Sequence, residues 1–372
     1  MKKNKLIKLR RELTINNIDG YIIPKNDEFF GEYVSPEKER LKYLTGFSGS
    51  AGQSLVLKKQ AFLFVDGRYT LQAQKEVRKG FKVIQIHKTI PSDILRKNKQ
   101  KLRIGFDPRI YSLASLINLY KTENVKLIPI KKNLIDKIWP NKPKLKFNKF
   151  FILKTQYAGK SFKNKINLIC KILKRKKIKN LLVTAPENVA WTLNIRGKDN
   201  SYSPIPNCNA IINCKKKITL IVENKKISKN FKSQFGKVVQ YVNPTDITSH
   251  FNSLDKKQNF LIDKFTCSYF YREKIAERFK YIEEIDPIFF LKSKKNIVEI
   301  NNTIKSHIAD GTALTKFIYW IKNNINKIKI SELSAQKKLE QFRKKNKNYV
   351  SPSFNTISGS GPNGAIVHYR AN

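Results

Sequence analysis

Segments with helical and strand-like patterns alternate along most of this chain, and that alternation restricts the fold more than any other feature. In the first part, Leu6, Leu9 and Leu13 recur at helical spacing. Apolar runs of strand length follow at residues 21–24, 54–57, 61–65, 81–86 and 126–130, and residues 69–77 suit a helix. This pattern favours an α/β domain. We expect it to span residues 1–145 and to close with a Pro- and Lys-rich linker at 139–146.

The second part of the chain repeats this plan. Its expected helices and strands lie at residues 160–175, 181–184, 185–191, 209–212, 218–222, 260–262 and 267–280. The similarity between the two parts predicts a pair of related α/β domains and not a short-period solenoid. We place the second domain at residues 146–290.

The third part, residues 291–372, begins with a long amphipathic helix. Ile297, Ile300, Ile304 and Ile308 follow one another at three-to-four spacing. A second helix is expected after Ser331, a suitable N-cap, and the segments 354–357 and 365–369 look strand-like around a glycine-rich turn. Two helices and two strands do not close a core. We therefore expect this part to be an incomplete α+β domain that exposes its isoleucine stripe.

The formal net charge of +47 raises the question of nucleic-acid binding. Lysine, however, is spread along the whole chain beside abundant Asn and Ile, which indicates a compositional habit and not a patch. The densest run of basic residues, 171–179, begins on an amphipathic helix. The exposure of this helix end to solvent is enough to explain the run. Nucleic-acid binding is therefore the weaker interpretation of this charge.

Composition also bears on the compartment. No stretch reaches the roughly 18 consecutive apolar residues of a membrane helix, and the basic start lacks the apolar core of a secretory signal. Four cysteines in 372 residues, with no zinc-type spacing, indicate reduced thiols. We expect a cytoplasmic protein that is not bound to a membrane.

Local motifs give few sites by themselves. Residues 359–364 match the letters G-x-G-x-x-G, but a strand-like run and not a helix follows, so dinucleotide binding is not indicated. His87, His250 and His307 are most simply surface or packing residues. His368 follows the glycine-rich turn, where its imidazole either reaches a ligand or packs beside the turn. The residues alone leave both interpretations open.

The order of the longer motifs resembles that of the Xaa-Pro aminopeptidase family (aminopeptidase P) within the creatinase/prolidase-type metallopeptidases. The motifs that carry the resemblance run in the family's order through nearly the whole chain, at residues 46–52, 65–69, 71–73, 134–140, 157–159, 184–191, 194–199, 295–299, 307–311, 353–357 and 361–369. The resemblance implies two creatinase-N-like α/β domains, followed by the truncated start of a pita-bread catalytic domain.

The resemblance also implies an activity and roles for two residues. Members remove an N-terminal residue that precedes proline, using two divalent metal ions, usually manganese. Arg68 matches the family's substrate-contacting arginine, and His368 matches the active-site histidine that contacts substrate and handles protons. The five metal ligands of the family lie beyond the last motif matched here. We therefore assign no metal ligand in this chain and expect the chain alone to bind no metal.

The expected partners are peptides with proline in the second position, and the full-length protein is expected to allow a homodimer. One alternative is a non-enzymatic interaction protein built from the two N-terminal domains; the reading frame beyond Asn372 would discriminate between them. A basic nucleic-acid-binding protein is the other alternative, and its affinity would fall steeply with salt.

Overall fold

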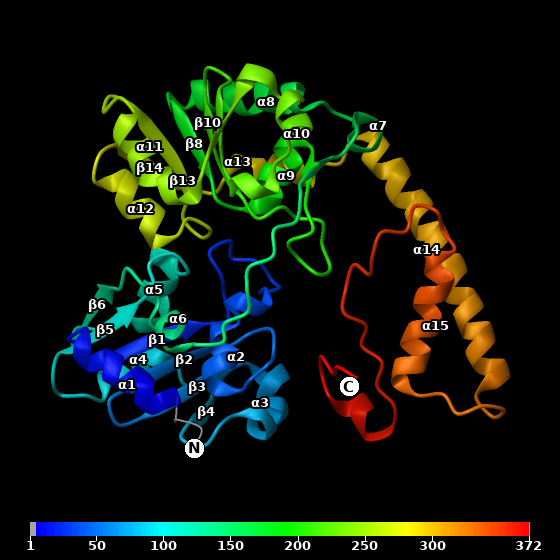
Figure 1. Ribbon diagram of the computed structural model, residues 1–372, viewed down its shortest axis with the longest axis horizontal. Helices are drawn as coiled ribbons and strands as arrows, with labels where there is room; N and C mark the ends of the chain where they lie inside the picture. The colour runs from blue at the N-terminus through cyan, green and yellow to red at the C-terminus, as the bar shows by residue number, and fades with distance from the viewer. Residues whose placement is uncertain (1–4, 372) are drawn as a thin grey trace.

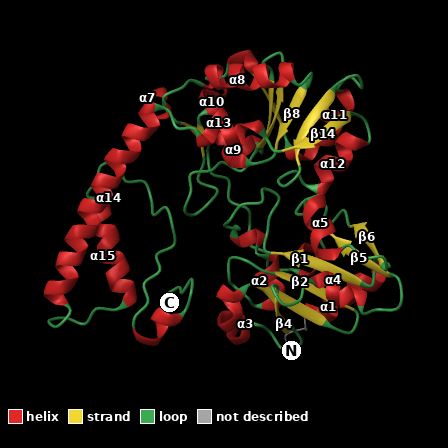
Figure 2. Cartoon of the chain, turned by 180° about the vertical axis from the view of Figure 1, so that it is seen from behind, coloured by secondary structure: helices red, strands yellow, loops and turns green. Residues whose placement is uncertain are grey.

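The computed structural model describes residues 5–371. These residues form two α/β domains, one above the other in Figure 1, and a long helical hairpin that leaves the second domain and runs down beside the first. The tail after the hairpin returns toward the first domain, so that the chain's C-terminal end lies close to α3 (Thr70–Glu76) in both views (Figures 1 and 2).

The first domain is built on a six-stranded sheet with the strand order β4-β3-β2-β1-β5-β6. Its strands are β1 (Gly20–Pro24), β2 (Gln53–Leu57), β3 (Ala61–Val65), β4 (Lys82–Gln85), β5 (Leu102–Phe106) and β6 (Val125–Pro129). Its helices are α1 (Lys5–Ile15), α2 (Arg40–Thr45), α3, α4 (Pro91–Arg96), α5 (Leu113–Tyr120) and α6 (Leu134–Ile138). Strand residues alternate between two apolar clusters, one on each face of the sheet.

The second domain repeats this topology, with the strand order β12-β11-β10-β8-β13-β14. Its strands are β8 (Asn180–Val183), β10 (Asn209–Asn213), β11 (Ile218–Ile221), β12 (Val239–Val242), β13 (Asn259–Asp263) and β14 (Lys280–Glu284), with β7 (Phe151–Ile152) and β9 (Ile195–Arg196) pairing apart. Its helices are α7 (Thr155–Ala158), α8 (Phe162–Arg175), α9 (Pro186–Leu193), α10 (Lys229–Ser233), α11 (Ile247–Ser253), α12 (Tyr269–Ala276) and α13 (Pro287–Ser293).

Corresponding strands of the two sheets also pair in the same directions. β2 in the first sheet and β10 in the second are antiparallel to both of their neighbours. The remaining strand pairs of both sheets are parallel. The prediction of two related α/β domains is therefore confirmed. The domains meet at equivalent positions, since Ser112 and Ser268, the N-caps of α5 and α12, form an antiparallel bridge. Beside it, the Tyr269 amide donates to the Tyr111 carbonyl at 2.7 Å.

The third part consists of α14 (Ile297–Asn324), α15 (Glu332–Lys344) and a tail with one short helical turn at Gly361–Ala365. α14 and α15 pack against each other side by side (Figure 1). Ala313 and Ala335 are the only buried residues within these two helices, and the isoleucine stripe of α14 is exposed. Asn296 caps α14 and also donates to the Ala158 carbonyl at 3.0 Å, which fixes the start of α14 to the second domain.

The expectation of a strand at residues 365–369 is wrong. The glycine-rich segment continues instead into a helical turn, and His368 takes a left-handed backbone conformation with φ of 58°. Residues 354–357, expected to be strand-like, have no strand conformation either. A strand needs a neighbour for its backbone hydrogen bonds, and no sheet within residues 5–371 includes the tail.

The four cysteines, Cys170, Cys208, Cys214 and Cys267, are free thiols, and all but Cys214 are buried. Burial raises the pKa of the Cys208 and Cys267 thiols well above the ordinary value. None of the helices within residues 5–371 combines the length and the apolarity that crossing a bilayer requires.

Candidate active site

Arg68 lies directly after β3, in a single helical turn at Gly67–Tyr69. Asp66 caps this turn by accepting a hydrogen bond from the Arg68 amide at 2.9 Å. The same carboxylate binds the Arg68 guanidinium through two bonds, Nε to Oδ1 at 3.0 Å and Nη2 to Oδ2 at 2.7 Å. The bond from Arg68 lowers the pKa of Asp66. Arg68 is 47% exposed, so its fork is held in a fixed orientation while one edge stays open.

His368 reaches the residue next to Arg68 from the other end of the chain. Its Nδ1 atom lies 3.1 Å from the hydroxyl of Tyr69, across a sequence separation of 299 residues. The two rings meet edge to face, with centroids 5.6 Å apart. Arg68 and His368 therefore both lie next to Tyr69, with the Arg68 guanidinium carbon 5.3 Å from the centroid of the Tyr69 ring, although no direct contact joins them.

Tyr69 is the fixed centre of this arrangement. It is buried, and its ring meets Phe47 edge-on at 5.8 Å. Gly49 permits this packing, because a Cβ there would lie 2.2 Å from the Phe47 ring and 2.9 Å from the Tyr69 ring. The Tyr69 hydroxyl also lies 2.6 Å from the hydroxyl of Ser50.

The loop 46–52 that surrounds Tyr69 is itself fixed at several points. Gly46 ends α2 with φ of 88°, a conformation that favours glycine. Ser48 donates to Glu76 from its amide at 2.7 Å and from its hydroxyl at 2.8 Å, which joins the loop to α3. The loop therefore presents Ser50 to Tyr69 from a defined backbone.

The tail that carries His368 is anchored by Glu332, the first residue of α15. Its carboxylate accepts from the Ser360 amide at 2.6 Å and from the Tyr369 hydroxyl at 2.8 Å. Although desolvation acts in the opposite direction, these bonds lower the pKa of Glu332. Farther back, Asn355 accepts a bond from the Tyr202 hydroxyl of the second domain at 2.9 Å.

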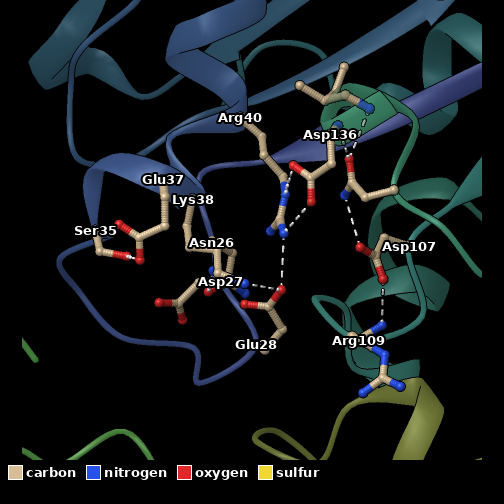
Figure 3. A network of polar contacts seen from close by, with 12 residues as sticks. Asn26, Asp27, Glu28, Ser35, Glu37, Lys38, Arg40, Asp107, Arg109 and Asp136 are labelled. Atoms are coloured by element: carbon tan, nitrogen blue, oxygen red, sulfur yellow. Dashed lines mark hydrogen bonds and ion pairs between the residues drawn. The ribbon is translucent and has the colours of Figure 1, made fainter. Parts of the chain in front are cut away.

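A buried polar network in the first domain supports the loop 25–38 near this junction (Figure 3). Arg40 is 2% exposed and binds both Glu28 and Asp136, each at 3.0 Å. Although burial opposes ionisation, Lys38 and Arg40 hold the pKa of Glu28 well below its usual range. Tyr33 belongs to this loop, and its ring lies 4.9 Å from that of Tyr202 in the second domain. The loop that the network holds therefore also contacts the second domain.

The described residues do not fit a metal centre. No group of three or more His, Cys, Asp or Glu side chains within residues 5–371 is placed to hold a metal ion. A divalent metal ion requires several oxygen or nitrogen ligands that converge on one point. No metal-dependent step is therefore assigned to residues of this chain.

Comparison with known families places all three parts of the chain. The description "Creatinase/Prolidase N-terminal domain" matches residues 5–138 and again residues 141–299. "Metallopeptidase family M24" matches residues 301–372. The chain belongs to the creatinase/prolidase-type metallopeptidases. The expected family resemblance is thereby confirmed for the two N-terminal domains and for the start of the M24 domain.

Several curated relatives of the chain are named as Xaa-Pro aminopeptidases. Xaa-Pro aminopeptidase ApepP of Drosophila melanogaster is 31% identical over 95% of this chain and 59% of its own length. Probable Xaa-Pro aminopeptidase P of Paracoccidioides brasiliensis (strain Pb03) is 32% identical over 99% of this chain and 63% of its own length. The chain thus spans about three fifths of the curated relatives it matches.

A solved structure agrees with these relatives in fold. X-prolyl aminopeptidase of Caenorhabditis elegans, described as a cytosolic enzyme with a di-nuclear active site, superposes with a TM-score of 0.90 at 25% identity. The match covers 98% of this chain and 63% of that structure's chain. The metallopeptidase chain therefore shares the arrangement of its domains with a di-nuclear enzyme.

Sequence motifs identified Arg68 and His368, and the roles given to them remain predictions. The same motifs contained Tyr69 and Ser50, which were not singled out. Their importance depends on the hydrogen bonds that Tyr69 makes to Ser50 and His368. A tyrosine directly beside a candidate substrate-binding arginine was the one signal in the sequence that could have indicated it.

Proposed function

We propose that this protein takes part in the metal-dependent hydrolysis of the bond between an N-terminal residue and a following proline. The names of its relatives and the family of its third part support this activity. An Xaa-Pro amide lacks an N–H group and has a ring where other peptides are flexible, so its recognition needs a dedicated site. In this proposal the chain supplies the substrate-binding face of such a site.

The observation that carries the proposal is the contact between His368 and Tyr69, the residue next to Arg68, across a sequence separation of 299 residues. A guanidinium that is already oriented by Asp66 can bind a peptide carbonyl or carboxylate with its open edge. An imidazole fixed at Nδ1 leaves Nε2 for exchange of a proton with the substrate. Arg68 thus has the role of orienting the peptide, and His368 that of catalysis and substrate contact.

Two divalent metal ions, Mn²⁺ in this proposal, supply Lewis-acid activation of the scissile carbonyl and its attacking water when bound. Residues 5–371 contain no cluster that could hold them, so the proposal assigns no metal ligand to these residues. We further propose domain boundaries at 145 and 290, a cytoplasmic location, and a homodimer as the working form.

Cleavage of matched peptides tests the proposal. The natural gene product, expressed in its own reading frame and supplied with Mn²⁺, should release alanine from Ala-Pro-Ala and leave Ala-Ala-Ala intact. Equal cleavage of both peptides would indicate a different specificity. Absence of cleavage in a folded, metal-loaded protein would favour the non-enzymatic interaction protein instead.

A further inference from the structure

Three polar side chains form a linear series beside the candidate site. The Ser50 hydroxyl lies 2.6 Å from the Tyr69 hydroxyl, which in turn lies 3.1 Å from Nδ1 of His368. Ser50 and His368 are both exposed, whereas Tyr69 is only 2% exposed. The Tyr69 oxygen therefore has one partner on the loop 46–52 and one partner on the tail.

The two distances are compatible with one particular assignment of donors and acceptors. A separation of 2.6 Å is typical of a strong O–H···O bond, and 3.1 Å lies in the N–H···O range. A phenol is a better hydrogen-bond donor than an aliphatic hydroxyl because it is more acidic. The Tyr69 hydroxyl has a single proton. If it donates that proton to Ser50, its lone pair faces Nδ1, and the Nδ1 atom must carry the proton of the neutral imidazole.

We propose that Tyr69 and Ser50 are positioning residues that hold the neutral His368 ring in its Nδ1–H tautomer, with the Nε2 lone pair facing the substrate. The inference rests on the proposed function for its catalytic meaning. The tautomer itself is a property of the chain. Neither residue touches the substrate in this assignment, and both act through the orientation of the imidazole.

In this arrangement His368 takes up one proton and gives up one proton in each turnover. Nε2 of neutral His368 takes a proton from the attacking water as the hydroxide adds to the scissile carbonyl carbon. The imidazolium then gives that proton to the leaving proline nitrogen as the C–N bond breaks, and the ring returns to its neutral form. The protons on Nδ1, Tyr69 and Ser50 stay in place, so their bonds need no rearrangement during turnover.

The geometry around Tyr69 makes this assignment rigid. Its ring is buried and packs against Phe47, a contact for which Gly49 leaves room, so its hydroxyl stays between Ser50 and His368. His368 holds a left-handed backbone conformation, which costs energy for a residue other than glycine. The Tyr369 bond to Glu332 keeps that conformation in place from the next residue.

Nuclear magnetic resonance on the chain labelled with ¹⁵N-histidine tests the tautomer directly. The sequence has four histidines, and His368→Gln assigns the signals of His368. At about pH 8.5, two units above an ordinary histidine pKa, long-range ¹H–¹⁵N correlations should show a protonated Nδ1 and an unprotonated Nε2. His307 is the internal reference, because its Nδ1 lies 3.0 Å from the Thr303 carbonyl, which can only accept a bond.

Two variants complete the test. Ser50→Ala removes the acceptor of the Tyr69 proton, so Tyr69 should turn that proton toward Nδ1 and shift His368 toward the Nε2–H tautomer. Tyr69→Phe preserves the buried ring and should give a mixture of tautomers. The His307 signals should not change in either variant, because His307 lies in α14 and, among the described residues, bonds only within that helix.

An Nε2–H tautomer in the unaltered chain, or unchanged His368 signals in both variants, would overturn the inference. In the enzyme that cleaves Ala-Pro-Ala, Tyr69→Phe should lower kcat roughly 10-fold with little effect on KM. Because the resonance measurement needs no turnover, a protein without peptidase activity would refute the proposed function and leave the tautomer result standing.

Discussion

At the scale of single residues, Arg68 combines a fixed orientation with an open edge. Arg68→Ala should raise KM for an Xaa-Pro peptide by roughly 10-fold or more and change kcat less, since it removes a paired contact to the substrate. Arg68→Lys should restore little, because an ammonium cannot make the paired bonds of a planar fork. Steady-state kinetics on Ala-Pro-Ala measure both effects.

The matched control for Arg68 is Arg96→Ala. Arg96 is also an exposed arginine of the first domain, paired with Asp93 at 3.1 Å, but it lies at the end of α4 and away from Tyr69. Its replacement should leave KM unchanged. Equal effects of the two substitutions would show that Arg68 acts through general charge and not through a specific contact.

Asp286 predicts a pH dependence of stability. It is buried at the N-cap of α13, and burial raises the pKa of Asp286 to about 6. The pKa of Asp286 in the folded chain therefore lies above its pKa in the unfolded chain. At pH values between the two, the folded chain holds a proton that the unfolded chain has lost. The contribution of Asp286 is therefore most favourable below pH 4 and decreases as the pH rises toward 6 and beyond.

Asp286→Asn tests this dependence. The amide oxygen can still accept from the Ile288 amide. The new NH₂ group replaces Oδ2, which accepts from Nδ2 of Asn188 at 2.8 Å, so the Asn188 amide has to flip and present its Oδ1 atom, which has no partner within the described residues. Between pH 4.5 and 7.5 the variant should gain about 2 kcal/mol relative to the parent in urea unfolding. Asp255→Asn, at an exposed carboxylate, should show no such change. A constant difference for Asp286→Asn would contradict the assignment.

At the scale of elements, glycines in different settings give opposite predictions. Gly311 lies within α14, and a Cβ there would meet nothing within 4 Å. Gly311→Ala should therefore stabilise the chain by about 0.5–1 kcal/mol through helix propensity. Gly49→Ala should destabilise it, because its Cβ would collide with Phe47 and Tyr69. Thermal unfolding of both variants measures the signs, and a destabilising Gly311→Ala would show that α14 is not helical at this position.

Sequence periodicity identified the elements whose apolar residues face a core. The strands at 54–57 and 61–65 and the helix at 160–175 agree with β2, β3 and α8. It missed β5, whose apolar run is interrupted by Arg103 and Gly105, and β14, an exposed edge strand with two glutamates. β14 begins where the helix expected at 267–280 was to end. An exposed strand such as β14 depends on its neighbour for hydrogen bonds and leaves no apolar pattern to detect.

The site could be predicted only in part for a related reason. Motifs placed Arg68 and His368 in the sequence, but the bond from Tyr69 to His368 depends on how the tail returns to the first domain. Local patterns predicted a strand at 365–369, because they contain no information on whether a partner strand lies beside the segment.

At the scale of the whole molecule, α14 leaves an apolar surface unpaired. Ile297, Ile300, Ile304 and Ile308 are all exposed. A chain that ends after Lys294 should therefore be more soluble than the 372-residue chain, which should self-associate. Light scattering at matched concentrations measures this. Replacing Ile300, Ile304 and Ile308 with Gln in the 372-residue chain should reduce self-association in the same way. If neither the shortened chain nor this variant associates less, the isoleucine stripe is not the cause of self-association.

Turnover of Ala-Pro-Ala shows whether His368 performs chemistry in the proposed Xaa-Pro aminopeptidase. It is compared between the natural gene product and its His368→Ala variant, with the metal content of each determined. We predict that kcat falls by roughly 100-fold or more, that KM changes less, and that metal content stays the same. Unchanged turnover of the variant at full metal loading would contradict a catalytic role and leave His368 as a residue that packs against Tyr69.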